Sequence, residues 1–283
     1  MSALRLRHTL PAAGMALAAL LPGAGCRSRQ DRAQAEHDAV EAIQKSDSVP
    51  VIAKQIVRAV ADSDAPAFAR LVDYPLERPY PLPDVADEHA MISYYPVLVD
   101  DSLHRVVTTS PPSAWSQLGW RGWTLLDGRY LWVDQSVYSV SYVSGRERVM
   151  LDSLVRLELA SLAPSLRGDW IPVMCLRAVG GTAVYRIDLA KGAHKGPAYR
   201  LAKFTSPAVM RQAPALTMTG YVAVEGSSGI ATYHFRACDG ETVSYTPFPA
   251  DGSQPTLDAT LPSGRDTAIA VSPSRWLDLL PKK

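Results

Sequence analysis

The groups best suited to acid–base chemistry are one carboxylate, two phenols and one imidazole. Asp134 ends the tryptophan-rich segment WSQLGWRGWTLLDGRYLWVD. Tyr94, Tyr95 and His104 precede it in the chain. A carboxylate in an apolar pocket opposite a tyrosine is suited to proton transfer, because burial raises the pKa of the carboxyl group. Each residue also fits an ordinary role, at a strand end, in packing or on a solvated helix face. We therefore assign no catalytic residue and expect a protein without enzymatic activity.

Metal and nucleophile motifs are missing from the sequence. The histidines show neither H-x-H nor H-E-x-x-H spacing, so the sequence predicts no metal site. It also contains no G-x-S-x-G motif and no phosphate-binding loop, and we expect no cofactor. The six histidines are His8, His37, His89, His104, His194 and His234.

Four of the six tryptophans lie within the segment quoted above. Such a cluster serves either as a stacking surface for a ligand or as the packed centre of a sheet. In the first case the aromatic and acidic residues of this region form one ligand pocket. Its members would be Tyr94, Tyr95, Trp120, Trp132 and Asp134.

The N-terminus carries a secretory signal. Arg5 and Arg7 precede an uncharged apolar run that is too short for an ordinary membrane span, and Cys26 follows it. Residues 1–25 resemble a bacterial lipoprotein signal, although Gly23 stands where leucine is usual. The resemblance implies that Cys26 is lipidated and anchors the mature protein. Lipoprotein sorting, by the same resemblance, favours the outer membrane, because no aspartate follows Cys26. The alternatives are ordinary cleavage, giving a soluble periplasmic protein, and an uncleaved anchor.

The two remaining cysteines lie in the second half of the chain. Cys175 and Cys238 could form one disulfide in an oxidising compartment. The alternative is two buried free thiols. Neither cysteine has the C-x-x-C spacing of a redox motif.

Hydrophobic periodicity divides the chain into segments. Residues 26–47 are polar and predict a flexible tether that is helical in part. Residues 48–165 begin with short helices, and the period changes from 3.6 to 2 at Trp115. Asp127-Gly128 predicts a hairpin turn within this part. A helix over 146–163 precedes the boundary.

The second half is rich in short alternating runs. Residues 166–275 therefore predict an all-β sandwich or small barrel, and 276–283 a C-terminal tail. The fold class is α+β, with N-terminal helices over a curved antiparallel sheet before the β-rich domain. The strands are expected at 170–177, 182–189, 198–205, 215–224, 230–237, 242–248 and 266–271.

Residues 66–143 resemble bacterial relatives of the nuclear transport factor two and ketosteroid-isomerase-like cone fold. The likeness rests on the helix order and on a hairpin with Gly122, Asp127-Gly128 and Trp132. It implies that helices cover a strongly curved sheet. Trp120 and Trp132 would then pack beneath the helices, and Trp115 would be the exposed tryptophan. The whole chain is also similar to a group of uncharacterised bacterial envelope proteins.

Composition excludes one class of partner. The net charge is +1 without a basic block, so nucleic acid is not expected. The leading hypothesis is a non-enzymatic lipid-anchored envelope protein, with the membrane bound through the lipid and a protein, glycan or lipid as partner. The alternative is a periplasmic small-molecule carrier or enzyme that uses the cone cavity. The sequence leaves the oligomeric state open.

Overall fold

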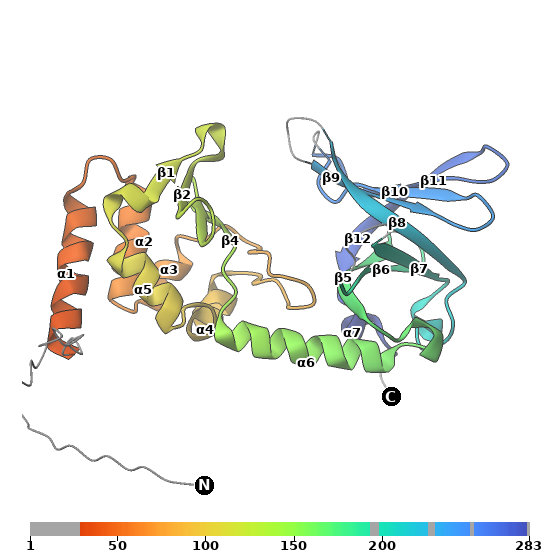
Figure 1. Cartoon of the computed structure of the whole chain (residues 1–283), viewed down its shortest axis with the longest axis horizontal. Helices are drawn as coiled ribbons and strands as arrows, with labels where there is room; N and C mark the ends of the chain where they lie inside the picture. The colour runs from red at the N-terminus through yellow and green to blue at the C-terminus, as the bar shows by residue number, and fades with distance from the viewer. Residues whose placement is uncertain (1–28, 193–197, 226–229, 250–251, 282–283) are drawn as a thin grey trace, which may run out of the picture.

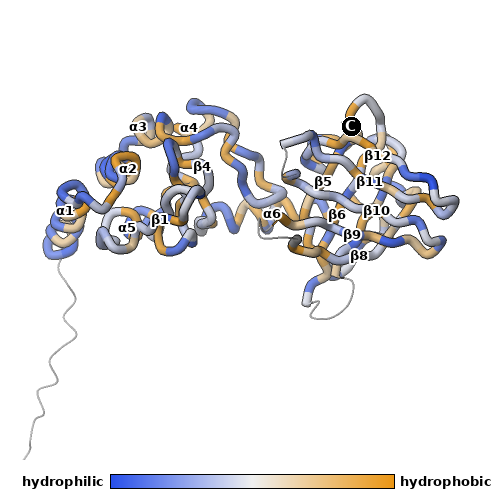
Figure 2. Tube along the Cα trace, turned by 90° about the horizontal axis from the view of Figure 1, so that it is seen from above, coloured by the Kyte–Doolittle hydropathy of each residue, from blue (hydrophilic) through white to orange (hydrophobic). Residues whose placement is uncertain are grey.

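The chain is described by a computed structural model at residues 29–192, 198–225, 230–249 and 252–281. The signal segment and Cys26 lie outside these residues. The described residues form an α+β protein with seven α-helices, a four-stranded antiparallel sheet and a closed eight-stranded antiparallel barrel. Figures 1 and 2 show two lobes joined by one long helix. None of the helices in the described ranges combines the length and apolar character needed to cross a membrane.

The first lobe packs helices against one face of the small sheet. Alternation sets this face, because Leu125 pairs with Trp115 and with Leu131, and all three side chains are buried. The helices are α1 (Arg29–Lys45), α2 (Val51–Ala61), α3 (Ala65–Ala69), α4 (Glu88–Leu98) and α5 (Asp101–Thr109). The strands are β1 (Trp115–Gln117), β2 (Trp123–Leu125), β3 (Leu131–Val133) and β4 (Val137–Val140), with short 3-10 turns at Pro112–Ala114 and Gly119–Arg121.

Aspartates begin three of these helices. Asp64, Asp87 and Asp100 each accept hydrogen bonds from backbone N–H groups of the first turn. Asp100 is therefore the N-cap of α5. Its carboxylate also accepts the N–H of Gly145 at 3.0 Å and the hydroxyl of Tyr142, so it joins two helix starts.

The predicted tether is wrong over most of its length. Residues Arg29–Lys45 form α1, which packs against α5 and α2. Val40 and Ile43 are buried there, three residues apart on one helical face. Two apolar side chains in a polar segment are a weak sequence signal. They are nevertheless the buried contacts through which α1 packs on α5 and α2.

A single helix connects the lobes. Helix α6 (Gly145–Ser161) starts with a reciprocal capping box between Ser144 and Glu147. It leaves the first lobe and runs to the barrel (Figure 1). Its fully buried side chains are two glutamates, Glu147 and Glu158, whereas the apolar Val149 and Leu157 are exposed.

The second lobe is the barrel, in the strand order β10-β11-β12-β5-β6-β7-β8-β9. The sequence allowed a sandwich or a barrel, and the closure of β9 on β10 gives the barrel. One strand, β11, was not predicted, because TLDAT has a single large apolar residue, Leu257. The strands are β5 (Trp170–Ala178), β6 (Val184–Ala190), β7 (Tyr199–Phe204), β8 (Leu216–Glu225), β9 (Ile230–Arg236), β10 (Thr242–Tyr245), β11 (Thr256–Thr260) and β12 (Asp266–Ser274).

The barrel has a core inside and a second core outside. Inward side chains such as Ile187, Leu201 and Leu257 fill the interior. On the outer face of β5–β7, Phe204 and Cys175 pack with Trp276. Trp276 is fully buried and begins α7 (Trp276–Leu279), so this part of the predicted C-terminal tail is a packed element. Two further 3-10 turns lie at Pro164–Leu166 and Pro207–Val209.

Candidate functional site

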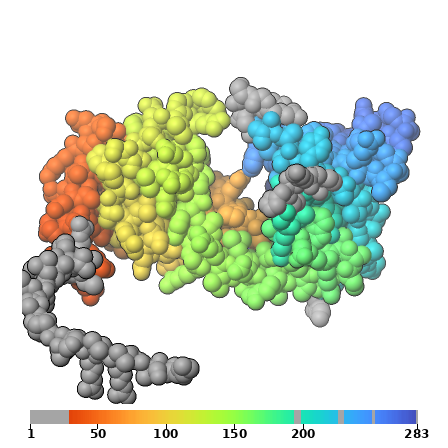
Figure 3. Space-filling view, viewed as in Figure 1, coloured from red at the N-terminus to blue at the C-terminus, as the bar shows by residue number. Residues whose placement is uncertain are grey.

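The candidate site is a cleft between the two lobes. The outer face of the small sheet forms one side of it, and Phe248, from the loop that follows β10, reaches the other side. The space has a volume of about 1020 Å³ and opens to solvent (Figure 3). Its other lining residues are Asp73, Trp120, Arg121, Trp132, Asp134, Gln135, Ser136, Tyr138 and Ser139.

Trp132 and Tyr138 form a fixed aromatic wall in this cleft. The Trp132 indole N–H donates to the Gly128 carbonyl at 3.0 Å and to the Ser141 hydroxyl at 3.2 Å. The Tyr138 hydroxyl donates to the Arg121 carbonyl at 2.8 Å. The two rings lie 6.4 Å apart. Because these hydrogen bonds already fix both side chains, little side-chain entropy is lost when a ligand packs on the rings.

Gly128 allows this arrangement. Its φ of +77° places it in the left-handed region that the hairpin turn requires. A Cβ atom at this position would overlap the Trp132 ring, so no larger residue fits beneath the indole. The Asp127-Gly128 turn predicted from the sequence is confirmed, and it also seats the tryptophan.

Two exposed aromatic side chains mark the rim. Trp120 is 87% exposed and Phe248 is 66% exposed. The Arg121 guanidinium lies 5.4 Å from the centre of the Trp120 ring, within the range of a cation–π contact. The rim therefore offers a large apolar area flanked by charge, from two elements that are distant in the sequence.

The tryptophan roles expected from the cone resemblance are wrong. Trp115 is buried, with 4% of its surface exposed, whereas Trp120 is the most exposed large apolar residue among the described residues. The cause is local: Gly119 and Gly122 both have positive φ values, so a 3-10 turn interrupts the expected strand and turns Trp120 outward. Trp132 also lies on the face away from the helices, because it alternates with Leu131 and Val133, whose side chains belong to the core beneath the helices.

Three of the five residues named for a single pocket line the cleft, namely Trp120, Trp132 and Asp134. Tyr94 and Tyr95 do not. Tyr95 is buried against Phe68 with ring centres 5.5 Å apart, and burial raises its pKa to about 12. The Tyr94 hydroxyl donates to Glu147 at 2.8 Å, and burial, reinforced by that carboxylate, raises the Tyr94 pKa.

His104 lies at a different place again. Its side chain is partly exposed on α5, and Nδ1 approaches a carboxylate oxygen of Glu36 at 3.7 Å. The four groups considered for proton transfer are therefore not assembled into one site. His104 helps to seat α1 instead.

The predicted disulfide is not formed. Cys175 and Cys238 are both free. Cys175 is buried in the outer core of the barrel, whereas Cys238 is exposed in the turn after β9. One thiol therefore lies in the outer core and the other at the solvent-exposed end of a strand pair. Burial raises the pKa of the Cys175 thiol, which keeps it protonated.

Sequence reasoning missed Asp73, Tyr138 and Phe248 in the cleft. The alternation of Tyr138 with the apolar Val137 could have placed Tyr138 on the outer face of the sheet. Phe248 carried no such signal, since it is contributed by the other lobe.

The segment 74–83 holds the connecting helix α6 in place and so helps to determine the geometry of the cleft. Arg78 donates to the buried Glu147 carboxylate at 2.8 Å and to the carbonyls of Val140 and Tyr142. Tyr80 donates to Glu158 at 2.8 Å. Glu147 and Glu158 are separated by about three helical turns and face the same side. One segment therefore holds both ends of α6.

Glu158 is the meeting point of the two lobes. Arg186 of β6 donates to it at 2.8 Å, and the backbone N–H of Trp276 donates to the Tyr80 hydroxyl at 3.2 Å. Burial raises the pKa of Glu158, and Arg186 counteracts this shift. Arg186 also binds Asp188 at 2.7 Å and lies 5.0 Å from the Trp276 ring centre.

The network continues across the barrel surface. Arg200 binds Asp188 at 2.7 Å and donates to the Leu166 carbonyl at 3.0 Å. Two arginines thus neutralise two carboxylates in a buried set. Such sets specify geometry more than they add stability. This one positions the barrel against α6 and therefore defines the distance across the cleft.

No set of three metal-ligating side chains occurs in the described part of the chain. Comparisons of this chain with protein-family models, with curated proteins and with solved structures returned no match.

Proposed function

We propose that this chain is a non-enzymatic, lipid-anchored envelope protein that binds a partner protein in the cleft between its lobes. The observation that carries the proposal is the exposed Trp120 facing a rigid wall of Trp132 and Tyr138. A protein does not usually leave a tryptophan 87% exposed beside a hollow of this size without a use for it.

The composition of the cleft favours a protein as the partner. Tryptophan, tyrosine and arginine are the residue types that dominate binding energy at protein interfaces, and Trp120, Tyr138 and Arg121 supply all three. Rigid aromatic rings lose little entropy when a partner binds. The hydroxyl and amide groups of Ser136 and Gln135 supply the polar contacts around them.

The anchor belongs to the proposal as well. Residues 1–25 have the character of a lipoprotein signal, and Cys26 is the residue to be lipidated. The described chain then begins with α1, which is docked on the first lobe. The start of α1 would therefore sit close to the membrane, because only two residues separate Cys26 from Arg29. The cone-fold relationship of the first lobe and the outer-membrane location are parts of the same proposal.

The rival function is a small-molecule carrier or an enzyme. One observation favours it: Asp134 lies in the same cleft as Trp132 and Tyr138, which is an acid among aromatic rings. This space is on the outer face of the sheet, while the face toward the helices is filled by Trp115, Leu125 and Leu131. A carrier or an enzyme of this kind would bind a small molecule with Asp134 in contact.

Site-specific crosslinking in intact cells tests the proposal. A photoreactive amino acid replaces Trp120 in one variant and Val51 in the other. Val51 is 71% exposed on α2, outside the cleft, so it is the matched control. We expect a discrete protein adduct at position 120 and none at position 51. Identical patterns at both positions, or no adduct at either, would reject the cleft as a protein-binding site.

Membrane fractionation with mass spectrometry tests the anchor. The wild-type chain should carry acyl groups on Cys26 and remain with the membranes, whereas Cys26→Ser should be released. An unmodified Cys26 in the mature wild-type protein would remove the anchor from the proposal. The crosslinking result would then apply to a diffusible protein.

A further inference from the structure

The barrel carries a second hollow on its outer face. Its lining residues differ from those of the interlobe cleft. It crosses five neighbouring strands, β8 to β12, and has a volume of about 970 Å³. Strands lie about 4.8 Å apart, so the trough is about 19 Å long. None of the residues of the interlobe cleft lines it.

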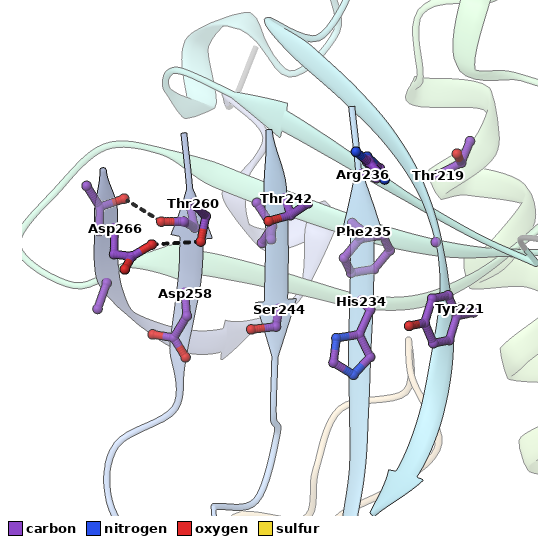
Figure 4. A pocket seen from close by; sticks show the side chains of 15 residues that line it. Thr219, Tyr221, His234, Phe235, Arg236, Thr242, Ser244, Asp258, Thr260 and Asp266 are labelled. Atoms are coloured by element: carbon purple, nitrogen blue, oxygen red, sulfur yellow. Dashed lines mark hydrogen bonds between the residues drawn. The ribbon is translucent and has the colours of Figure 1, made fainter. Parts of the chain in front are cut away.

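Two rows of outward side chains line the trough. Strand register places the members of each row side by side, as Figure 4 shows. The first row runs through Tyr221, His234, Ser244, Asp258 and Ala268.

The second row is polar at every position. It consists of Thr219, Arg236, Thr242, Thr260 and Asp266. The Thr260 hydroxyl donates to Asp266 at 2.8 Å, which orients this carboxylate along the row. Side-chain hydroxyls and carboxylates thus follow one another across the sheet at strand spacing.

An aromatic pair closes one end of the trough. The rings of Tyr221 and His234 lie 5.2 Å apart with an interplanar angle of 29°. Gly220 brings their strands together, because a Cβ atom there would overlap the carbonyl oxygen of His234. Tyr221 is 56% exposed, so part of its ring is available to a ligand.

We propose that this trough binds a neutral glycan chain. The face of a sugar ring carries C–H groups that pack on an aromatic ring such as Tyr221. Sugar hydroxyl groups donate to carboxylates and exchange hydrogen bonds with threonine and serine hydroxyls, and Asp258, Ser244 and Thr242 supply both kinds of group. The elongated shape fits a chain of several sugar units.

The other ligand classes fit less well. Asp258 and Asp266 against the single guanidinium of Arg236 disfavour nucleic acid and other polyanions. The outward side chains are too polar for a lipid tail. A peptide strand needs a free sheet edge, and these strands belong to a closed barrel.

Calorimetry with the purified full chain tests the inference. The probes are three neutral hexasaccharides, of β-1,4-linked glucose, β-1,4-linked N-acetylglucosamine and α-1,4-linked glucose. We expect saturable binding of at least one of them. Tyr221→Ala and Asp258→Asn should each weaken that binding at least tenfold, whereas Val224→Ala should not change it. Val224 is an exposed residue of the same strand outside the trough, and it is the matched control.

Either of two results would overturn the inference. One is that none of the three hexasaccharides binds at millimolar concentration. The other is that one binds but Tyr221→Ala leaves the affinity unchanged. If Trp120→Ala loses binding while Tyr221→Ala keeps it, the inference is also overturned, and the glycan binds in the interlobe cleft. Because these residues are exposed, equal urea midpoints for all variants would show that folding is unaffected.

Discussion

At the scale of single residues, neighbouring tryptophans have opposite roles. Trp115 contributes to the core of the first lobe, and its indole N–H has no hydrogen-bond partner among the described residues. Trp120, five positions later, contributes its surface to the cleft. Two glycines with positive φ on either side of Trp120 produce the difference. Residue type alone therefore does not assign function within this segment.

Truncating these two tryptophans should have contrasting effects on stability. Trp115→Ala should lower the free energy of unfolding by about 3–5 kcal/mol, because it leaves a large cavity in the core. Trp120→Ala should change it by no more than about 0.5 kcal/mol. Urea unfolding followed by far-ultraviolet circular dichroism measures both. Trp115→Phe is the intermediate control, since it keeps most of the packing and removes the unpaired N–H. Equal losses for the two alanine variants would contradict the assigned burial.

The two free thiols provide a second test at this scale. Cys238 should react with a thiol reagent at neutral pH within minutes, because it is exposed. Cys175 should react only after denaturation, because it is buried and its pKa is raised by that burial. Mass spectrometry of the labelled protein counts the modified sites. A chain that shows no reactive thiol before reduction would mean that the disulfide exists after all.

At the scale of elements, the helix starts are joined through Asp100. Its carboxylate caps α5 and accepts the N–H of Gly145 at the start of α6. Burial raises the Asp100 pKa, but hydrogen bonds from Leu103, Gly145 and Tyr142 outweigh this influence, so the net pKa is lowered. The hydrogen bonds of the folded protein therefore favour the ionised form of the Asp100 carboxyl group. The connecting helix is thus coupled to the first lobe by a charge.

This coupling predicts a specific pH dependence. A carboxyl group with a lowered folded-state pKa stabilises the fold above its unfolded value, near 3.8, and loses this contribution as the pH falls. Asp100→Asn should therefore be less stable than the wild type at pH 6, and the two should converge as the pH falls well below 3.8. Asparagine keeps the cap, so the comparison isolates the charge. A difference that stays constant from pH 6 to pH 2 would contradict the assignment.

At the scale of the whole molecule, a buried charge network joins the lobes, together with the apolar cluster around Trp276, against which Tyr80 and Leu159 pack. Glu158 of α6 binds Tyr80 from the first lobe and Arg186 from the barrel. These contacts fix one geometry of the joint, although Nη2 of Arg186 is buried without a hydrogen-bond partner among the described residues. This geometry determines how Phe248 faces the small sheet and hence the width of the cleft.

Removing Arg186 should therefore be costly. Arg186→Met leaves the Glu158 and Asp188 carboxylates without this buried partner and should lower the free energy of unfolding by about 3–5 kcal/mol. Arg177→Met, at an exposed position of the neighbouring strand β5, is the control and should have little effect. Chemical unfolding measures both. A similar small change in the two variants would show that the network does not hold the lobes together.

The sequence by itself determined the local features of this protein. Apolar alternation located most barrel strands, and Asp127-Gly128 located the hairpin turn. These signals lie within a few residues of each other, so they can be read from the chain. The same reasoning missed β11 and the docking of α1, where only one or two apolar side chains carry the signal.

Only the tertiary structure decided which surfaces meet. The cleft combines Trp120 with Phe248, and the joint combines Tyr80 with Arg186, although more than 100 residues separate the members of each pair. Periodicity reports which side of an element is apolar, but it does not report which distant element covers that side. The register of five strands likewise assembled the trough from residues that are individually unremarkable in sequence. Sites built across elements are therefore a property of the fold, because their geometry depends on packing between segments that carry no information about one another.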